Sequence, residues 1–134
     1  MRSVPFCFLV VLPLAAACVP HRDLTVAQIG GATKLSELMD VQATVADPQW
    51  SKIDKTGYSD ADWAALMDLA TRIQATSTKD KEFSKGPGFD ALAQQLHTNA
   101  DALQTATTSK SEAGASDALR AMKATCKECH SKFR

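Results

Sequence analysis

The sequence predicts an all-α fold, an antiparallel four-helix bundle. Alternating apolar and polar residues, which would indicate strands, are scarce along the chain. Four segments instead repeat apolar residues every three or four positions, as one face of a helix requires. The connectors between these segments carry the Pro, Gly and Ser residues typical of turns. Because the connectors are short, we expect consecutive helices to lie antiparallel.

Residues 1–17 have the pattern of a secretory signal peptide. Arg2 precedes an apolar run, and small residues follow that run before Cys18. The apolar run is too short to span a bilayer, so a transmembrane helix is the weaker interpretation. We therefore expect the mature chain to be exported to a bacterial periplasm.

Cys18 stands at the expected cleavage point of this signal. The stretch from Leu14 to Cys18 resembles a bacterial lipoprotein box, in which the Cys becomes the lipidated N-terminus, although Ala15 stands where a larger aliphatic residue is usual. Ordinary cleavage after Ala17 would instead leave a free thiol. We expect lipidation of Cys18, so that residues 18–23 form a tether and the lipid anchor is the protein's contact with the membrane.

The bundle domain is expected to span residues 24–134, and its first helix to run from about Leu24 to Ala46. Gly30-Gly31 interrupts this helix at a cost of about 1 kcal/mol per Gly relative to Ala, so we expect the regular part to begin near Thr33. Pro48 ends the helix, and Trp50 in the connector is expected to pack on the bundle. The apolar stripe consists of Ile29, Leu35, Leu38, Met39, Gln42 and Val45.

The second and third helices follow from the same periodicity. Ser59 or Asp60 can cap the second helix, which is expected to continue to about Thr76. After a polar loop over residues 79–88, the third helix is expected over Phe89–Thr107. The two inner faces consist of Trp63, Leu66, Met67, Ala70 and Ile73, and of Phe89, Leu92, Leu96, Ala100 and Leu103.

The fourth helix follows a polar turn over residues 109–114 and carries a seam of inward-facing residues. The steps along this seam alternate between four and three residues, as expected for a bundle-facing edge. The seam consists of Ala115, Leu119, Met122, Cys126, Cys129 and Phe133. Because His130 projects beside Cys129, one helical turn presents two thiols and one imidazole together.

Cys126-Lys127-Glu128-Cys129-His130 is the attachment signature of c-type haem. In this motif two thiols add across the two vinyl groups of the porphyrin, and the adjacent imidazole faces the iron. The sequence therefore predicts one covalently bound haem c inside the bundle. Cys126 and Cys129 are the expected thioether anchors, and His130 is the expected proximal axial ligand.

Two other kinds of site share the Cys-x-x-Cys pair. A redox dithiol would usually lie at the start of a helix that follows a strand. A zinc site needs two further ligands. The remaining candidates for such ligands, none of them paired at ligand spacing, are Cys7, Cys18, His21 and His97. Haem attachment is the favoured interpretation.

The segment Cys126-x-x-Cys129-His130-x-x-Phe133-Arg134 on a last helix resembles the class II cytochrome c family, also called the cytochrome c prime family. The resemblance implies a four-helix bundle that holds one haem near the C-terminal end of its last helix. It also implies that Arg134 covers the imidazole or pairs with a haem propionate. We expect Met122 to touch the ring edge and Phe133 to contact the haem.

The same resemblance implies two states for the distal side of the iron. One is five-coordinate with an apolar distal residue, and the other is six-coordinate and low-spin with a Met from the first helix. Leu35, Leu38 and Met39 lie in the corresponding zone, and only Met39 supplies a thioether. Leu38-Met39-Asp40-Val41-Gln42 resembles the ligand stretch of low-spin relatives. We therefore expect Met39 and His130 to ligate the iron, the alternative for Met39 being a flexible core side chain.

The charge balance and the absence of catalytic motifs narrow the function further. The chain has 15 basic and 15 acidic residues, which argues against nucleic acid as a partner. We expect a periplasmic electron-transfer protein, not an enzyme, that exchanges single electrons with redox partner proteins of the bacterial envelope. The alternative is a five-coordinate protein that binds nitric oxide or carbon monoxide at a vacant position walled by Leu35 and Leu38. The resemblance also suggests a homodimer formed through the first two helices.

Overall fold

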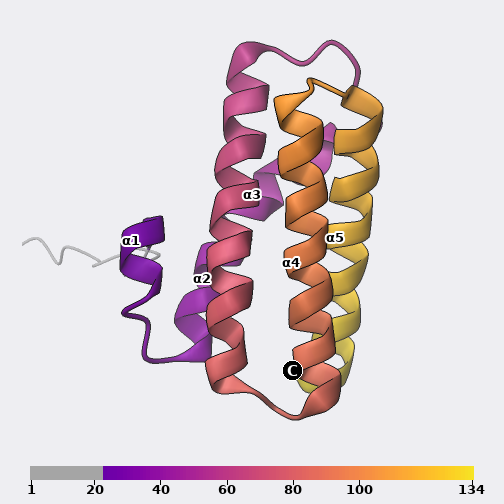
Figure 1. The fold of residues 1–134 in the computed structure, drawn as a ribbon. Coiled ribbons are helices and arrows are strands. Elements are labelled where there is room, and N and C mark those ends of the chain that lie inside the picture. Colours follow the sequence, from indigo (N-terminus) through magenta and orange to yellow (C-terminus); the bar gives the residue numbers. More distant parts are fainter. Residues whose placement is uncertain (1–22) are drawn as a thin grey trace, which may run out of the picture.

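The computed structural model describes residues 23–134, and four of its helices form a bundle. These helices are α2 (Leu35–Ala46), α3 (Asp60–Asp80), α4 (Pro87–Thr108) and α5 (Glu112–Phe133). Helices α3, α4 and α5 alternate in direction, and the shorter α2 lies beside the lower part of α3 (Figure 1). The predicted all-α bundle is confirmed. The predicted signal peptide, Cys18 and most of the predicted tether lie outside the described residues.

The first predicted helix is split into two pieces. A single turn, α1 (Val26–Ile29), precedes Gly30-Gly31, and α2 begins only at Leu35. Glu37 fixes this second start, because its Oε2 accepts hydrogen bonds from the backbone N–H groups of Thr33 and Lys34 at 2.9 and 3.2 Å. The interruption at Gly30-Gly31 was expected, and the regular helix begins two residues after the expected start near Thr33.

Helix α3 is longer than predicted and ends at Asp80 instead of Thr76. In its polar last turns Ser77 Oγ donates to the Ile73 carbonyl at 2.6 Å and Thr78 Oγ1 donates to the Gln74 carbonyl at 2.8 Å, so both hydroxyls bond back to the preceding turn of the helix. The extra turn carries Asp80 into the interior of the bundle, where it is buried. A short 3-10 helix, η2 (Lys81–Phe83), follows.

The remaining helix ends differ from prediction by a few residues. Pro87 occupies the first position of α4, after Gly86 with φ 111°, so α4 starts two residues before Phe89. Ser111 caps α5 by accepting a hydrogen bond from the Gly114 N–H at 3.1 Å. The polar turn before α5 is therefore shorter than the predicted segment 109–114.

The long connector after α2 is ordered by contacts with α5. It begins with a 3-10 helix, η1 (Asp47–Lys52), in which Trp50 packs against the core as predicted. Further along, the Asp54 N–H donates to Ser116 Oγ at 2.8 Å. The Gly57 and Tyr58 N–H groups both donate to Glu112 Oε1, at 2.8 and 2.9 Å. The connector thus closes the end of the bundle where α3 and α5 begin.

Two groups of buried apolar residues hold the bundle together. The larger one lies among α3, α4 and α5, and the smaller one joins α2 and α1 to α3. The largest fully buried apolar side chains are Ile29, Leu38, Val41, Leu66, Leu69, Ile73, Leu103, Leu119 and Met122. Among the helices that the structure describes, none has the length and apolar character needed to cross a bilayer.

Candidate functional site

Most of the predicted site residues meet at a cavity between α2 and α5. This cavity has a volume of about 360 Å³, within the range expected for a small-molecule or cofactor site. Two smaller cavities, of about 210 and 30 Å³, share Met39 and His130 with it. The 360 Å³ cavity is lined by Leu35, Ser36, Met39, Asp40, Ala43, Lys85, Phe89, Cys129, His130, Phe133 and Arg134.

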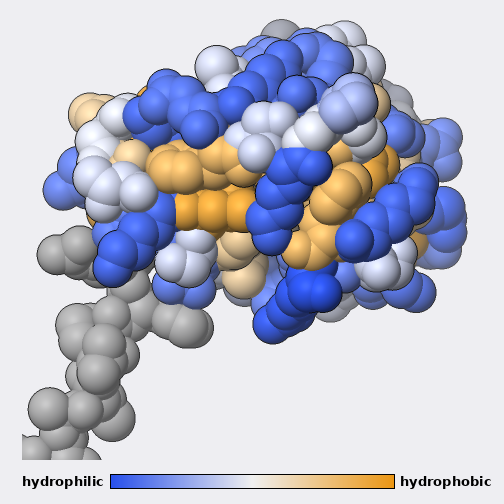
Figure 2. All heavy atoms as spheres, turned by 90° about the horizontal axis from the view of Figure 1, so that it is seen from below, coloured by the Kyte–Doolittle hydropathy of each residue, from blue (hydrophilic) through white to orange (hydrophobic). Residues whose placement is uncertain are grey.

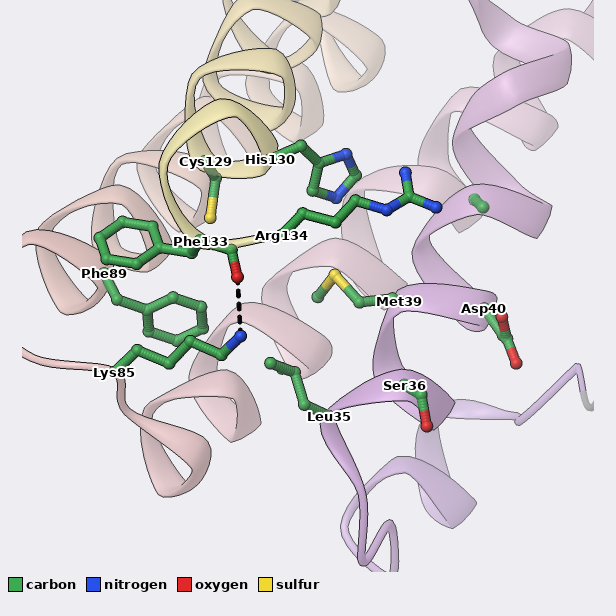
Figure 3. Close-up of a pocket in the computed structure, with 11 residues that line it drawn as sticks. Leu35, Ser36, Met39, Asp40, Lys85, Phe89, Cys129, His130, Phe133 and Arg134 are labelled. Atoms are coloured by element: carbon green, nitrogen blue, oxygen red, sulfur yellow. Dashed lines mark hydrogen bonds between the residues drawn. The ribbon is translucent and has the colours of Figure 1, made fainter.

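Met39 and His130 enter this space from two different helices (Figure 3). Met39 is half-buried on α2, and His130 is exposed on α5. The side chain of Arg134 extends from the end of α5 between the two (Figure 3). Cys129 lies one position before His130 on the same helix, and Cys126 lines the two smaller cavities. The thioether of α2 is thus brought close to an imidazole and two thiols of α5, which are far from it in sequence.

The end of the bundle that carries these residues is partly apolar at its surface. Seen from below, hydrophobic side chains are visible between hydrophilic ones (Figure 2). Exposed cations border the cavities, and these are Lys85, Lys123, Lys127 and Arg134. A ligand between α2 and α5 would therefore have apolar walls and a charged rim.

Aromatic packing holds the end of α5 against the start of α4. The rings of Phe89 and Phe133 meet edge to face, with their centroids 5.6 Å apart. Lys85 Nζ donates a hydrogen bond to the Phe133 carbonyl at 2.8 Å, which satisfies a carbonyl in the last turn of α5. These contacts fix the direction in which Cys129 and His130 leave the helix.

Cys126 and Cys129 carry free thiols in the last part of α5. Burial is the main cause that raises the pKa of the Cys126 thiol to about 11, and it also raises the pKa of the Cys129 thiol. Both thiols are thus protonated at neutral pH, whereas redox dithiols and zinc sites use thiolates. Within the described residues no group of three or more His, Cys, Asp or Glu is placed to hold a metal ion. The environment favours uncharged sulfur, as in a thioether.

A buried polar network borders the smallest cavity. Gln42 Nε2 on α2 donates to Asp80 Oδ2 at 2.8 Å and to Thr76 Oγ1 at 3.1 Å, both on α3. Burial raises the pKa of the Asp80 carboxyl to about 6, although the hydrogen bond from Gln42 acts in the opposite direction. This network links α2 to α3 directly beside the site.

The structure places most of the predicted site residues together, with two exceptions. Leu38 and Met122 are fully buried in the apolar cores and do not line these cavities. The predicted residues that do line them are Leu35, Met39, Cys126, Cys129, His130, Phe133 and Arg134.

Sequence reasoning did not assign Asp80, Lys85 or Phe89 to the site. Phe89 was expected on an inner helix face, which was a usable signal for its position. Lys85 and Asp80 were both placed in the polar loop over residues 79–88, because the second helix was expected to end at about Thr76. Gln42 was placed on the inner stripe of its helix, and an amide on an apolar stripe signals a buried polar partner.

The residues present fit a c-type haem. Two neutral thiols and an imidazole lie within one turn of α5, as the attachment chemistry requires. The thioether of Met39 lines the same cavity from α2, and Phe89 and Phe133 supply apolar walls. A helical bundle with this constellation between its helices defines a c-type cytochrome of the four-helix class.

A comparison with protein families identifies the particular family. Residues 31–134 match the family described as Cytochrome C', and the chain therefore belongs to that family. The match includes α2 to α5 and hence every residue that lines the site. Membership implies a haem c cofactor. No curated protein and no solved structure gives a significant match to the chain.

Proposed function

We propose that this c-type cytochrome carries single electrons, with His130 and Met39 as the axial ligands of one covalently attached haem. The observation that supports the proposal most directly is the convergence of these two side chains on one cavity from α5 and α2. A bound haem supplies the one-electron chemistry of ferric and ferrous iron. Two ligands from the chain would leave no coordination position for a substrate, which favours electron transfer over catalysis.

The helices that carry the two ligands are held by packing away from the cavity. On α2, Leu38 and Val41 are fully buried against α3, so the helix presents Met39 from a fixed position. On α5, the contact of Phe133 with Phe89 fixes the turn that carries His130. A site whose ligands barely move needs little rearrangement when the iron changes oxidation state, which suits rapid electron exchange.

We further propose that the protein works in the periplasm, tethered through a lipid at Cys18. The support comes from the signal-like residues 1–17 and from the lipoprotein-box resemblance of the stretch before Cys18. The redox partners would approach the end of the bundle where the cavities open. Exposed cations at that end would favour partners with an acidic surface.

The test of axial ligation is an absorption spectrum of Met39→Ala in both oxidation states. If Met39 ligates the iron, its removal converts a low-spin six-coordinate spectrum into a high-spin one. Met67→Ala is the matched control, because Met67 is a half-buried Met on α3 that lines none of the three cavities described above. Spectra of Met39→Ala identical to those of the parent and of the control would contradict the proposal.

A second candidate function is the binding of nitric oxide or carbon monoxide at a five-coordinate iron. Leu35 favours this candidate, because its apolar side chain lines the same cavity as Met39 from the same helix. The parent protein distinguishes the two functions directly. A high-spin ferric spectrum and rapid carbon monoxide binding after reduction would support gas binding, and a low-spin spectrum with slow binding would support electron transfer.

A further inference from the structure

Asp80 is a buried carboxylate that the proposed axial ligation does not use. It is the last residue of α3, and only 3% of its surface is exposed. Its Oδ2 accepts the 2.8 Å hydrogen bond from Gln42, but its Oδ1 is buried without a hydrogen-bond partner among the described residues. An acceptor left without a partner inside a protein is costly, and such cases call for an explanation.

The surroundings of Asp80 do little to neutralise its charge. Gln42 uses both hydrogens of its amide nitrogen, one toward Asp80 and one toward Thr76, so it has none left for the second carboxylate oxygen. No ion pair between described residues includes Asp80. Because burial raises the pKa only to about 6, the carboxylate is ionised at pH 8.

Asp80 faces the haem site. It lines the 30 Å³ cavity together with Met39, Cys126, Cys129 and His130. Its charge also contributes to the raised pKa of both thiols, which places its field at the two expected attachment points. The charge of this carboxylate therefore acts on the group that the thiols would hold.

The other charged side chains around the cavities differ from Asp80 in their contact with water. All of them are exposed, and they are Asp40, Asp47, Lys85, Lys123, Lys127 and Arg134. Solvent and salt screen exposed charges strongly and buried charges much less. Asp80 is thus the charge at this site with the strongest expected effect on the iron.

We propose that Asp80 lowers the redox potential of the haem iron, because its buried negative charge stabilises the ferric state. The proposal rests on the proposed function, in which the iron cycles between ferric and ferrous forms. On reduction the iron accepts one electron from an external one-electron donor, and no bond to Asp80 forms or breaks. A fixed negative charge nearby favours the more positive ferric haem. Burial and nearby charge are among the factors that set the redox potential of haem proteins.

The test compares the midpoint potentials of the parent, Asp80→Asn and Glu82→Gln at pH 8. Asp80→Asn removes the buried charge with little change in shape. Glu82→Gln is the matched control, because it removes a charge two residues away whose side chain is 63% exposed and paired with Lys79. Potentials are measured by equilibrium redox titration with mediators, monitored through the haem absorption. Asp80→Ser serves as a second neutral variant that keeps a small polar side chain at this position.

We expect the Asp80 variants to raise the ferrous-to-ferric ratio at a fixed applied potential at least tenfold, which corresponds to about 59 mV. Glu82→Gln should change that ratio less than twofold. Potentials of both Asp80 variants that equal the potential of Glu82→Gln would overturn the role of Asp80. The absorption spectrum of the parent tests the axial ligands separately. A five-coordinate iron would contradict the electron-transfer proposal, whereas the role of Asp80 would still be decided by the measured potentials.

Discussion

The two ends of the bundle differ in what fills them. At the end where α3 and α5 begin, the chain fills its own interior, and Leu66, Leu103 and Leu119 are fully buried there. At the opposite end, where the chain terminates in Figure 1, cavities separate α2 from the last turns of α5. The first end is a self-sufficient core, whereas the second is shaped around a group that the polypeptide does not supply.

The polar contacts differ between the two ends in the same way. At the closed end, where α3 and α5 begin, no buried side-chain polar atom of the described residues lacks a partner, and Ser59 Oγ accepts a hydrogen bond from the Asp62 N–H at 3.2 Å. At the open end, where the cavities separate α2 from the last turns of α5, Asp80 Oδ1 and Asp90 Oδ1 are buried without hydrogen-bond partners among the described residues. Unsatisfied groups concentrate at functional sites, because function there outweighs stability. The comparison leads to four predictions, beginning with the largest expected effect.

Removing the attachment points should affect the open end most strongly. In Cys126→Ser/Cys129→Ser the thiols are replaced by similar side chains that cannot form thioethers. We expect a mature protein without the added mass of a porphyrin, with reduced helicity and with rapid amide exchange in α2 and the last turns of α5. Mass spectrometry, circular dichroism and hydrogen exchange measure these changes.

The closed end provides the internal control for that experiment. Its amides in α3 and α4 near Leu66 and Leu103 should keep more of their protection than those of α2, because their packing does not involve the cavities. A double variant with the parent's helicity and with full protection of α2 would contradict the division of the bundle into two ends.

Truncating a core side chain should cost more at the closed end than at the site. Leu103→Ala removes a fully buried side chain from the core between α3, α4 and α5, and we expect it to lower the free energy of unfolding by about 2 to 5 kcal/mol. Leu35→Ala alters a half-buried residue at the cavity wall, so its cost should be clearly smaller. Urea unfolding followed by circular dichroism compares the two variants, and equal costs would show that the open end is packed as tightly as the core.

The same difference explains what could be predicted from the sequence. Helical periodicity placed Leu66, Leu103 and Leu119 on inner faces, because the closed core is built from regular amphipathic helices. The haem motif at Cys126, Cys129 and His130 is local in sequence, and it was sufficient to indicate the cofactor that the family membership implies.

The remaining features depend on contacts between distant segments. Asp80 lies at the site because α3 continues to Asp80 through a polar stretch that resembles a loop, in which the hydroxyls of Ser77 and Thr78 bond to carbonyls four residues earlier. The hydrogen bond between Asp80 and Gln42 joins residues 38 positions apart, and no local sequence pattern predicts that these two residues pair. Leu38 and Leu35 lie on the same predicted stripe, yet Leu38 is buried against α3 and Leu35 lines the cavity, since a stripe does not specify which neighbour it meets.

Removing the hydroxyl that caps α3 should have a moderate effect confined to stability. Ser59→Ala leaves the Asp62 N–H without its side-chain acceptor, and we expect the free energy of unfolding to fall by about 1 kcal/mol. The redox potential and absorption spectra should not change, because the cap lies at the end of the bundle remote from the cavities. A variant that alters the spectrum would show that the two ends are coupled.

The smallest expected effect depends on pH and concerns Asp62 at the same helix start. The Ser59 N–H donates to Asp62 Oδ2 at 3.0 Å and Lys55 Nζ lies 3.0 Å from the same oxygen, which together hold the pKa of this carboxyl well below its usual range. Because the pKa is lower in the folded state, ionised Asp62 stabilises the fold above the unfolded-state pKa of about 3.9, and this contribution is lost as the pH falls toward the folded-state pKa. Asp62→Asn should therefore be less stable than the parent at pH 7, and the difference should shrink below about pH 4. Asp60→Asn controls for loss of a negative charge in the same turn, and equal losses for the two variants at pH 7 would contradict a specific role of Asp62.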